Sequence, residues 1–163
     1  MANVELPRNL PLLFMQARDV VFAAFRPILN DAGLTEQQWR VIRALYELEP
    51  LEPNQICDVC LILSPSLAGI LARMEKLGLI RKSRVKNDQR RVLIRLTAKS
   101  RALVEKVVPL IVEQYRLIER ATGPKLFADM YSVLDNVVAL KDAGIPRVAL
   151  PAKRSTKKTI KDT

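Results

Sequence analysis

The chain has 163 residues, of which 49% are hydrophobic, and a formal net charge of +10. This length and composition predict one folded domain rather than a disordered chain. Because the chain has no histidine, the usual catalytic triads are excluded, and we expect neither an enzyme nor a bound cofactor or metal. No segment resembles a signal peptide or a membrane-spanning helix, so we expect a cytoplasmic protein without a membrane partner.

The positive charge is concentrated in two segments. Residues 81–95 contain seven basic side chains and one acidic one, and residues 152–163 contain five basic side chains and one acidic one. The rest of the chain is therefore neutral. This distribution predicts a polyanionic partner bound at one place. Nucleic acid is the first candidate, and an anionic membrane surface is the second, which we do not expect to be the partner.

A long first helix is predicted over residues 9–30, where apolar side chains recur every three or four residues. Thr35 is the expected N-cap of a second helix, because Gln38 occupies the position that completes a capping box. Leu34 and Trp39 stand at the two positions of a hydrophobic staple. Trp39 therefore has a predicted structural role beside any role in binding.

The next two helices carry the clearest functional pattern. A short helix is predicted to begin at Pro53 and to bury a stripe made of Ile56, Val59, Cys60 and Leu63. In the following segment, LSPSLAGILARMEKLGLI, Ser64 is the predicted N-cap and Gly78 the predicted stop. Its polar face consists of Ser66, Gly69, Arg73 and Lys76. This is the helix-turn-helix pattern, in which the second helix enters the major groove of DNA.

Residues 79–85 and 91–96 predict two strands, joined by a turn at residues 86–90. A hairpin that follows a helix-turn-helix is a wing, and its basic tip can bind phosphates or a minor groove. Asp88 is expected to orient Arg90 or Arg91. The predicted DNA-binding residues are Ser64, Ser66 and Arg73 in the helix and Arg84, Lys86, Arg90 and Arg91 in the wing.

Two long helices are predicted after the wing, one capped by Thr97 and one opened by Pro124 and closed near Gly144. The fold class is therefore mainly α with a small β-hairpin wing. Its predicted parts are an N-terminal dimerisation helix (1–34), a winged helix-turn-helix lobe (35–96), C-terminal dimerisation helices (97–144) and a basic, disordered tail (145–163). A homodimer would present its two recognition helices to a palindromic, double-stranded operator.

Cys57 and Cys60 have the spacing of a redox motif. The predicted context is a short helix rather than a thioredoxin-like βαβ unit, and two thiolates without histidine cannot complete a zinc site in one chain. We interpret them as a buried structural pair, and a thiol switch remains the alternative.

Over about residues 8–142 the chain resembles the MarR family of bacterial winged-helix repressors. The resemblance rests on the order of the elements, the small residues of the recognition helix and its exit EKLGLI, the pair of Asp88 and Arg90 at the wing tip, and the strand that ends in Leu96 and Thr97. Ser100 stands where the family pattern has glycine. The segments QARDVVFAAFRPILN and LTEQQWRVIRAL are also similar to the branch typified by the repressor of the homoprotocatechuate degradation operon. The resemblance implies regulation by hydroxyphenylacetate-type aromatic acids.

An aromatic acid needs a flat apolar slot, a cation for its carboxylate and a polar partner for its hydroxyl. The resemblance implies that Phe25, Trp39, Arg43 and Tyr115 bind this ligand. The residues themselves add two ligand candidates, Arg18, which lies among phenylalanines on the first helix, and Asn9, which could reach across the dimer. Arg18 could instead pair with a carboxylate of the protein, and Trp39 and Tyr115 could belong only to the core.

We therefore expect a homodimeric DNA-binding repressor of an aromatic-acid catabolic operon, relieved by a phenolic carboxylic acid such as a hydroxyphenylacetate. Two alternatives remain open. One is a MarR-type regulator that senses oxidants through its cysteines. The other is an architectural DNA-binding protein without an effector, which would show little preference for a palindrome.

Overall fold

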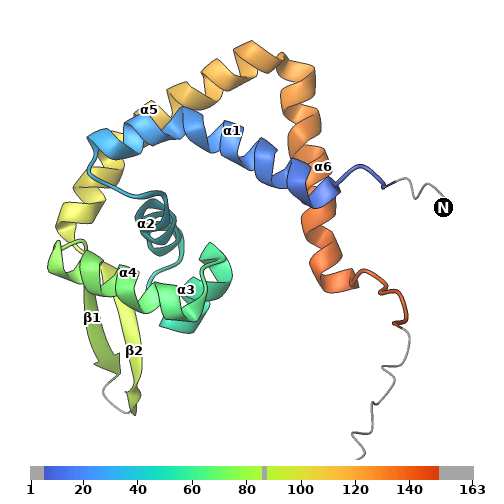
Figure 1. Cartoon of the computed structure of the whole chain (residues 1–163). Coiled ribbons are helices and arrows are strands. Elements are labelled where there is room, and N and C mark those ends of the chain that lie inside the picture. Colours follow the sequence, from blue (N-terminus) through green and yellow to red (C-terminus); the bar gives the residue numbers. More distant parts are fainter. Residues whose placement is uncertain (1–5, 86–87, 151–163) are drawn as a thin grey trace, which may run out of the picture. The chain divides into compact units, whose positions relative to one another are not determined.

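The computed structural model describes residues 6–85 and 88–150 (Figure 1). In chain order the elements are α1 (Leu10–Asp31), α2 (Glu36–Leu48), α3 (Pro53–Cys60), α4 (Ser64–Lys76), β1 (Ile80–Val85), β2 (Asp88–Leu96), α5 (Ala98–Thr122) and α6 (Pro124–Ala143). The predicted fold class is thus confirmed. The chain divides into two compact units, Met1–Ile118 and Glu119–Thr163.

Local sequence signals define the ends of the first two helices. The side chain of Asn9 caps α1 and accepts a hydrogen bond from Leu12 N at 3.0 Å. At the start of α2 the predicted capping box is confirmed: Gln38 N donates to Thr35 Oγ1 at 3.2 Å, and Thr35 N donates to Gln38 Oε1 at 2.9 Å. Leu34 and Trp39 are both buried, as the staple requires.

The connection between α3 and α4 differs from the prediction. The N-cap of α4 is Leu63, and Ser64 is the first helical residue instead of the cap. This shift is tolerated because the first turn of a helix has free N–H groups, so Pro65 fits at its second position. At the other end Gly78 has φ +68° and donates to Glu75 O at 2.9 Å, which confirms the predicted stop.

The buried stripe predicted for α3 is only half right. Ile56 and Cys60 are buried, but Val59 and Leu63 are 51% and 78% exposed. Val59 is turned away from Cys60 by one residue step of about 100°. The helix then ends at Cys60, where Leu61 takes a left-handed conformation with φ 50°, so Leu63 does not continue the helical period. Ile62 is buried in its place.

The wing is an antiparallel hairpin in which Ile80 lies opposite Leu96. The second strand begins earlier than predicted, at Asp88, because the register shifts after Arg84 and Val85 lies opposite Asp88. The loop between α2 and α3 adds a bridge to β2, since Ile94 N donates to Leu51 O at 2.8 Å.

The core of the first unit lies where α2, α3 and α4 pack against one another and against the hairpin (Figure 1). Its fully buried apolar side chains are Val41, Ile42, Leu45, Ile56, Leu67, Ile70, Met74 and Ile94. Ser100 is also fully buried, and its hydroxyl donates to Leu79 O. This hydrogen bond explains how serine is accommodated where the family pattern has glycine, because a buried hydroxyl needs a partner.

The second unit contains the end of α5 and the whole of α6, which begins after Gly123 and closes at Gly144 as predicted. Phe127 and Tyr131 stack edge to face, with ring centroids 5.3 Å apart. None of the α6 side chains is buried in the single chain. Its exposed apolar residues are Leu126, Tyr131, Val133, Leu134, Val137, Val138 and Leu140.

Residues 145–150 follow α6 without forming a helix or strand, and residues 151–163 of the predicted tail lie outside the described part of the chain. Within residues 6–85 and 88–150, no single helix is long and apolar enough to cross a membrane. Only α3 and α4 taken together reach the required length and hydropathy, across a bend of 109°.

Candidate DNA-binding surface and ligand site

The outer face of α4 carries the residues predicted to read DNA. Ser64, Ser66 and Arg73 are exposed, while Leu67, Ile70, Leu71 and Met74 are buried on the opposite face. A Cβ on Gly69 would meet only the guanidinium of Arg73, at 3.8 Å. Among the described residues, Arg73 forms no ion pair with an acid. The helix therefore presents small and hydroxyl side chains near its N-terminus and a free cation behind them.

The tip of the wing supplies further free cations. Arg84 and Arg90 are exposed, and neither has an acidic partner among the residues that the structure describes. Asp88 accepts a hydrogen bond from the backbone N of Arg90 at 3.0 Å, so it orders the backbone of Arg90 rather than its guanidinium. Lys86 lies outside the described residues. Two of the four predicted wing contacts are thus available to bind phosphates.

Arg91 is the exception, because it has an intramolecular partner that the sequence did not reveal. Its Nε donates to Glu52 Oε1 at 2.8 Å, and its Nη2 donates to the same oxygen. This hydrogen bonding raises the pKa of Arg91. Glu52 also caps α3, so the pair ties the wing to the start of the helix-turn-helix.

Three of the residues predicted to bind the ligand come together from α1, α2 and α5. The rings of Phe25 and Tyr115 are tilted against each other, with centroids 5.0 Å apart. Arg43 interacts with Tyr115 and donates from Nε to Glu47 Oε1 at 3.1 Å. This hydrogen bond is the main cause of a raised pKa for Arg43, and Tyr115 adds to it. Trp39 lies one turn earlier on α2 and is buried in the core.

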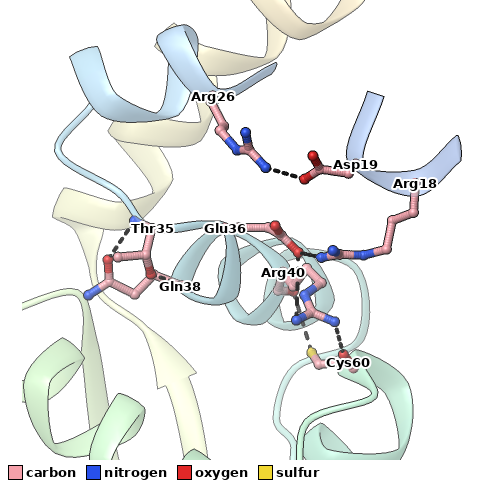
Figure 2. A network of polar contacts seen from close by, with 8 residues as sticks. All are labelled: Arg18, Asp19, Arg26, Thr35, Glu36, Gln38, Arg40 and Cys60. Carbon is pink, nitrogen blue, oxygen red and sulfur yellow. Dashed lines mark hydrogen bonds and ion pairs between the residues drawn. The ribbon is translucent and has the colours of Figure 1, made fainter. Parts of the chain in front are cut away.

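Arg18 lies on the same helix as Phe25 but pairs within the protein (Figure 2). Its guanidinium forms an ion pair with Glu36 and lies over the ring of Phe22, 4.5 Å from the centroid. The alternative of an internal carboxylate partner is thereby confirmed, although Arg18 remains 52% exposed. In the single chain Asn9 serves as the cap of α1.

Glu36 also faces a second arginine, Arg40, whose Nη2 lies 3.8 Å from Glu36 Oε1 (Figure 2). Arg40 Nη1 donates to Cys60 O at 2.7 Å, and the Cys60 thiol donates to Arg40 O at 3.5 Å. These contacts join α1, α2 and the end of α3. Burial raises the pKa of Cys60, so its thiol stays protonated at neutral pH.

One hollow of about 350 Å³ lies elsewhere on the first unit. It is lined by Ala32, Gly33, Leu34, Leu77, Leu79, Lys99, Ala102, Leu103 and Lys106, and includes none of the predicted ligand residues. Among the described residues, no group of three acidic, cysteine or histidine side chains could hold a metal ion.

The described geometry defines a class of protein. A helix-turn-helix with an exposed small and cationic face, followed by a basic hairpin, is a winged helix-turn-helix DNA-binding protein. The sequence profile of the MarR family matches residues 32–91. The chain is 40% identical over 129 residues to the transcriptional regulator FarR of Neisseria gonorrhoeae, covering 79% of this chain and 88% of that protein. It therefore belongs to the MarR family and is a transcriptional regulator, not an enzyme.

Two further relatives bear on the ligand. The homoprotocatechuate degradative operon repressor of Escherichia coli is 37% identical over 132 residues, covering 81% of this chain and 89% of that protein. The crystal structure of NadR in complex with 4-hydroxyphenylacetate is similar with a TM-score of 0.69 and 37% identity, and the match covers 84% of this chain and 97% of that one. The resemblance to the aromatic-acid branch is thus confirmed.

Proposed function

We propose that the protein is a homodimeric repressor of an aromatic-acid catabolic operon and that a phenolic carboxylic acid releases it from DNA. The observation that carries this proposal is the meeting of Phe25, Arg43 and Tyr115 from three different helices. Such a meeting offers two aromatic faces and a guanidinium fork in one place. The 4-hydroxyphenylacetate in NadR and the operon of the E. coli relative support the same ligand class.

The proposed binding mode follows from the chemistry of these groups. The ligand ring packs against Phe25, Tyr115 and the edge of Trp39. Its carboxylate takes a bidentate hydrogen bond from Arg43 or Arg18, since planar guanidinium groups match carboxylates. Both arginines already hold an acidic partner, Glu47 and Glu36 respectively, so the ligand competes with these carboxylates. Asn9 is proposed to contribute from the partner subunit.

The DNA-binding mode is proposed from the exposed cations and the helix order. Ser64, Ser66 and Arg73 meet base edges and backbone in the major groove, while Arg84, Lys86 and Arg90 meet phosphates or the minor groove. Arg91 joins them only when its pair with Glu52 opens. Residues 1–34 and 97–144 form the dimer, which α6 supports with its exposed apolar face. The dimer binds a palindromic operator in the cytoplasm.

The ligand releases the protein because it binds the DNA-free conformation more tightly than the DNA-bound one. A difference of about 100-fold in these two ligand affinities corresponds to a coupling free energy of about 2.7 kcal/mol between ligand binding and DNA binding.

The thiol-switch alternative has less support. Reactive cysteines have a lowered pKa and are accessible, whereas Cys60 is buried and its pKa is raised by that burial. Cys60 is better explained as part of the contact between α2 and α3. Cys57 is only partly buried, so the predicted buried pair is correct for Cys60 alone.

The proposal is tested by titrating the purified protein with a palindromic fragment from its own upstream region and with a scrambled control, at physiological salt. Each titration is repeated with 4-hydroxyphenylacetate and with its dihydroxy analogue. Specific binding that one acid weakens supports the ligand-responsive repressor. Specific binding that no aromatic acid changes contradicts the ligand part, and equal binding to both fragments contradicts the operator part.

A further inference from the structure

We propose that Arg40 is the positioning residue that transmits effector binding from α1 to the turn of the helix-turn-helix. The inference rests on the proposed function, because it concerns how an aromatic acid weakens DNA binding. Arg40 is not among the residues proposed to touch the ligand or the DNA. Its guanidinium instead lies between the acid that Arg18 holds and the last residue of α3 (Figure 2).

The first step in the argument is that Glu36 is a shared carboxylate. Its Oε1 accepts from Arg18 on α1 and lies 3.8 Å from Arg40 Nη2 on α2. Arg18 is the closer partner, so Arg40 has only a long contact with this acid. Glu36 is 23% exposed and Arg40 30%, which means that neither charge is fully screened by water.

The second step is that Arg40 holds the end of α3. Its Nη1 donates at 2.7 Å to the carbonyl of Cys60, one of the C-terminal carbonyls that a helix leaves without an internal partner. The next residue, Leu61, takes the left-handed conformation that turns the chain toward α4. The Cys60 thiol returns a hydrogen bond to Arg40 O at 3.5 Å, so α2 and this turn are joined at two points.

The third step is that the guanidinium has an alternative arrangement. Arg40 Nε is buried and has no hydrogen-bond partner among the described residues, so the present contacts leave one of its donors unfilled. A buried donor without a partner is unfavourable. The guanidinium therefore gains free energy if it moves toward a carboxylate that can accept a hydrogen bond. The carboxylate that lies within reach is Glu36.

Together these contacts form a charge relay that an acidic effector drives. When the carboxylate of the effector takes Arg18, Glu36 loses its closer cation. Arg40 then moves to Glu36, and its hydrogen bond to Cys60 O is weakened. The loss releases the end of α3 and shifts the turn that sets the start of α4, the recognition helix. Binding of the effector at α1 thus changes the position of the helix that contacts DNA.

The test compares Arg40→Met with Arg26→Met in the full-length protein. Arg26 also pairs with an acid, Asp19, in the same region, but has no contact with α3 in the described structure (Figure 2). Calorimetry measures 4-hydroxyphenylacetate binding, and operator titration measures DNA affinity with and without the acid. We expect Arg40→Met to bind the acid within about 3-fold of wild type, while the acid changes its DNA affinity by less than about 2-fold. Arg26→Met should respond as wild type does.

Arg40→Lys and Glu36→Gln keep the test decisive if Arg40→Met fails to fold. Lysine retains the charge but not the fork, and should restore part of the response. Glutamine at position 36 removes the charge for which the arginines compete, and should abolish the response. A full response in Arg40→Met, or in Glu36→Gln when Arg40→Met does not fold, overturns the relay. Wild-type protein whose DNA binding ignores every acid instead overturns the proposed function.

Discussion

Arg91 in β2 and Glu52 at the N-terminus of α3 form a hydrogen-bonded ion pair across 39 residues of sequence. The pair gives Arg91 a different status from Arg84 and Arg90, because one of the cations in the wing is already neutralised by the protein. Glu52 also caps α3, so the contact fixes the wing to the helix-turn-helix.

This pair predicts that Glu52→Gln strengthens DNA binding. The substitution frees the charge of Arg91 and leaves in place the capping hydrogen bond from the backbone N of residue 52 to Gln55 Oε1. The slope of log affinity against log salt should become steeper by about 1, the contribution of one additional phosphate contact. Titrations of random-sequence DNA at several salt concentrations measure this slope. Glu105→Gln, an exposed acid on α5, is the matched control, and equal slopes for the two variants would contradict the prediction.

Arg90→Ala should have the opposite effect. Arg90 is exposed and has no acidic partner in the described structure, so its loss removes a cation that is available to DNA. We expect weaker binding and a salt slope reduced by about 1. Arg26→Ala removes an arginine from the surface of α1 and serves as the control. Unchanged affinity in Arg90→Ala would show that the wing does not contact DNA.

Ser100→Ala tests the buried hydroxyl at the start of α5. It removes the hydrogen bond to Leu79 O, but this carbonyl still accepts from Thr97 N at 3.2 Å and is not left without a partner. The expected loss is therefore about 1 kcal/mol of unfolding free energy rather than the larger cost of an unpaired group. Urea denaturation measures it. Ser100→Gly should lose more, because glycine is also unfavourable in a helix by about 1 kcal/mol.

Cys60 predicts a pH dependence of stability. Burial raises the pKa of the folded thiol above its ordinary value of 9.0, so above pH 9.0 the unfolded chain loses this proton more readily than the folded one. The stabilisation is fully present below this pH and is lost as the pH rises through the folded pKa. Urea denaturation of wild type and Cys60→Ala between neutral and alkaline pH measures the difference. The two curves should converge at high pH, and parallel curves would disprove the assignment.

The exposed apolar face of α6 predicts that Leu134→Glu disrupts the dimer. Leu134 is 47% exposed in the single chain and lies among other exposed apolar residues of the helix. A charge buried at an interface without a partner is strongly unfavourable. Light scattering after gel filtration should report a monomer, while Lys141→Glu near the end of the helix should remain dimeric. A dimeric Leu134→Glu would place the interface elsewhere.

The elements that could be predicted from sequence are those governed by neighbouring residues. The capping box at Thr35, the stop at Gly78 and the exposed face of α4 depend on contacts within a few residues, and each was found where the pattern indicated. The basic charge of the wing is likewise a property of composition. Prediction from neighbouring residues is wrong where the chain changes direction. The left-handed conformation of Leu61 interrupts the helical period of apolar residues, so the predicted burial of Leu63 is wrong.

Partners that are distant in sequence were decided by the tertiary structure alone. Phe25 meets Tyr115, Arg91 meets Glu52 and Arg40 meets Cys60 only after the helices have packed. The amino-acid sequence determined which side chains carry charge, which helices form and which face of α4 stays exposed. Which charge each cation meets depends on the packed distance between helices, because a hydrogen bond requires donor and acceptor to lie about 3 Å apart, and no local pattern specifies that distance.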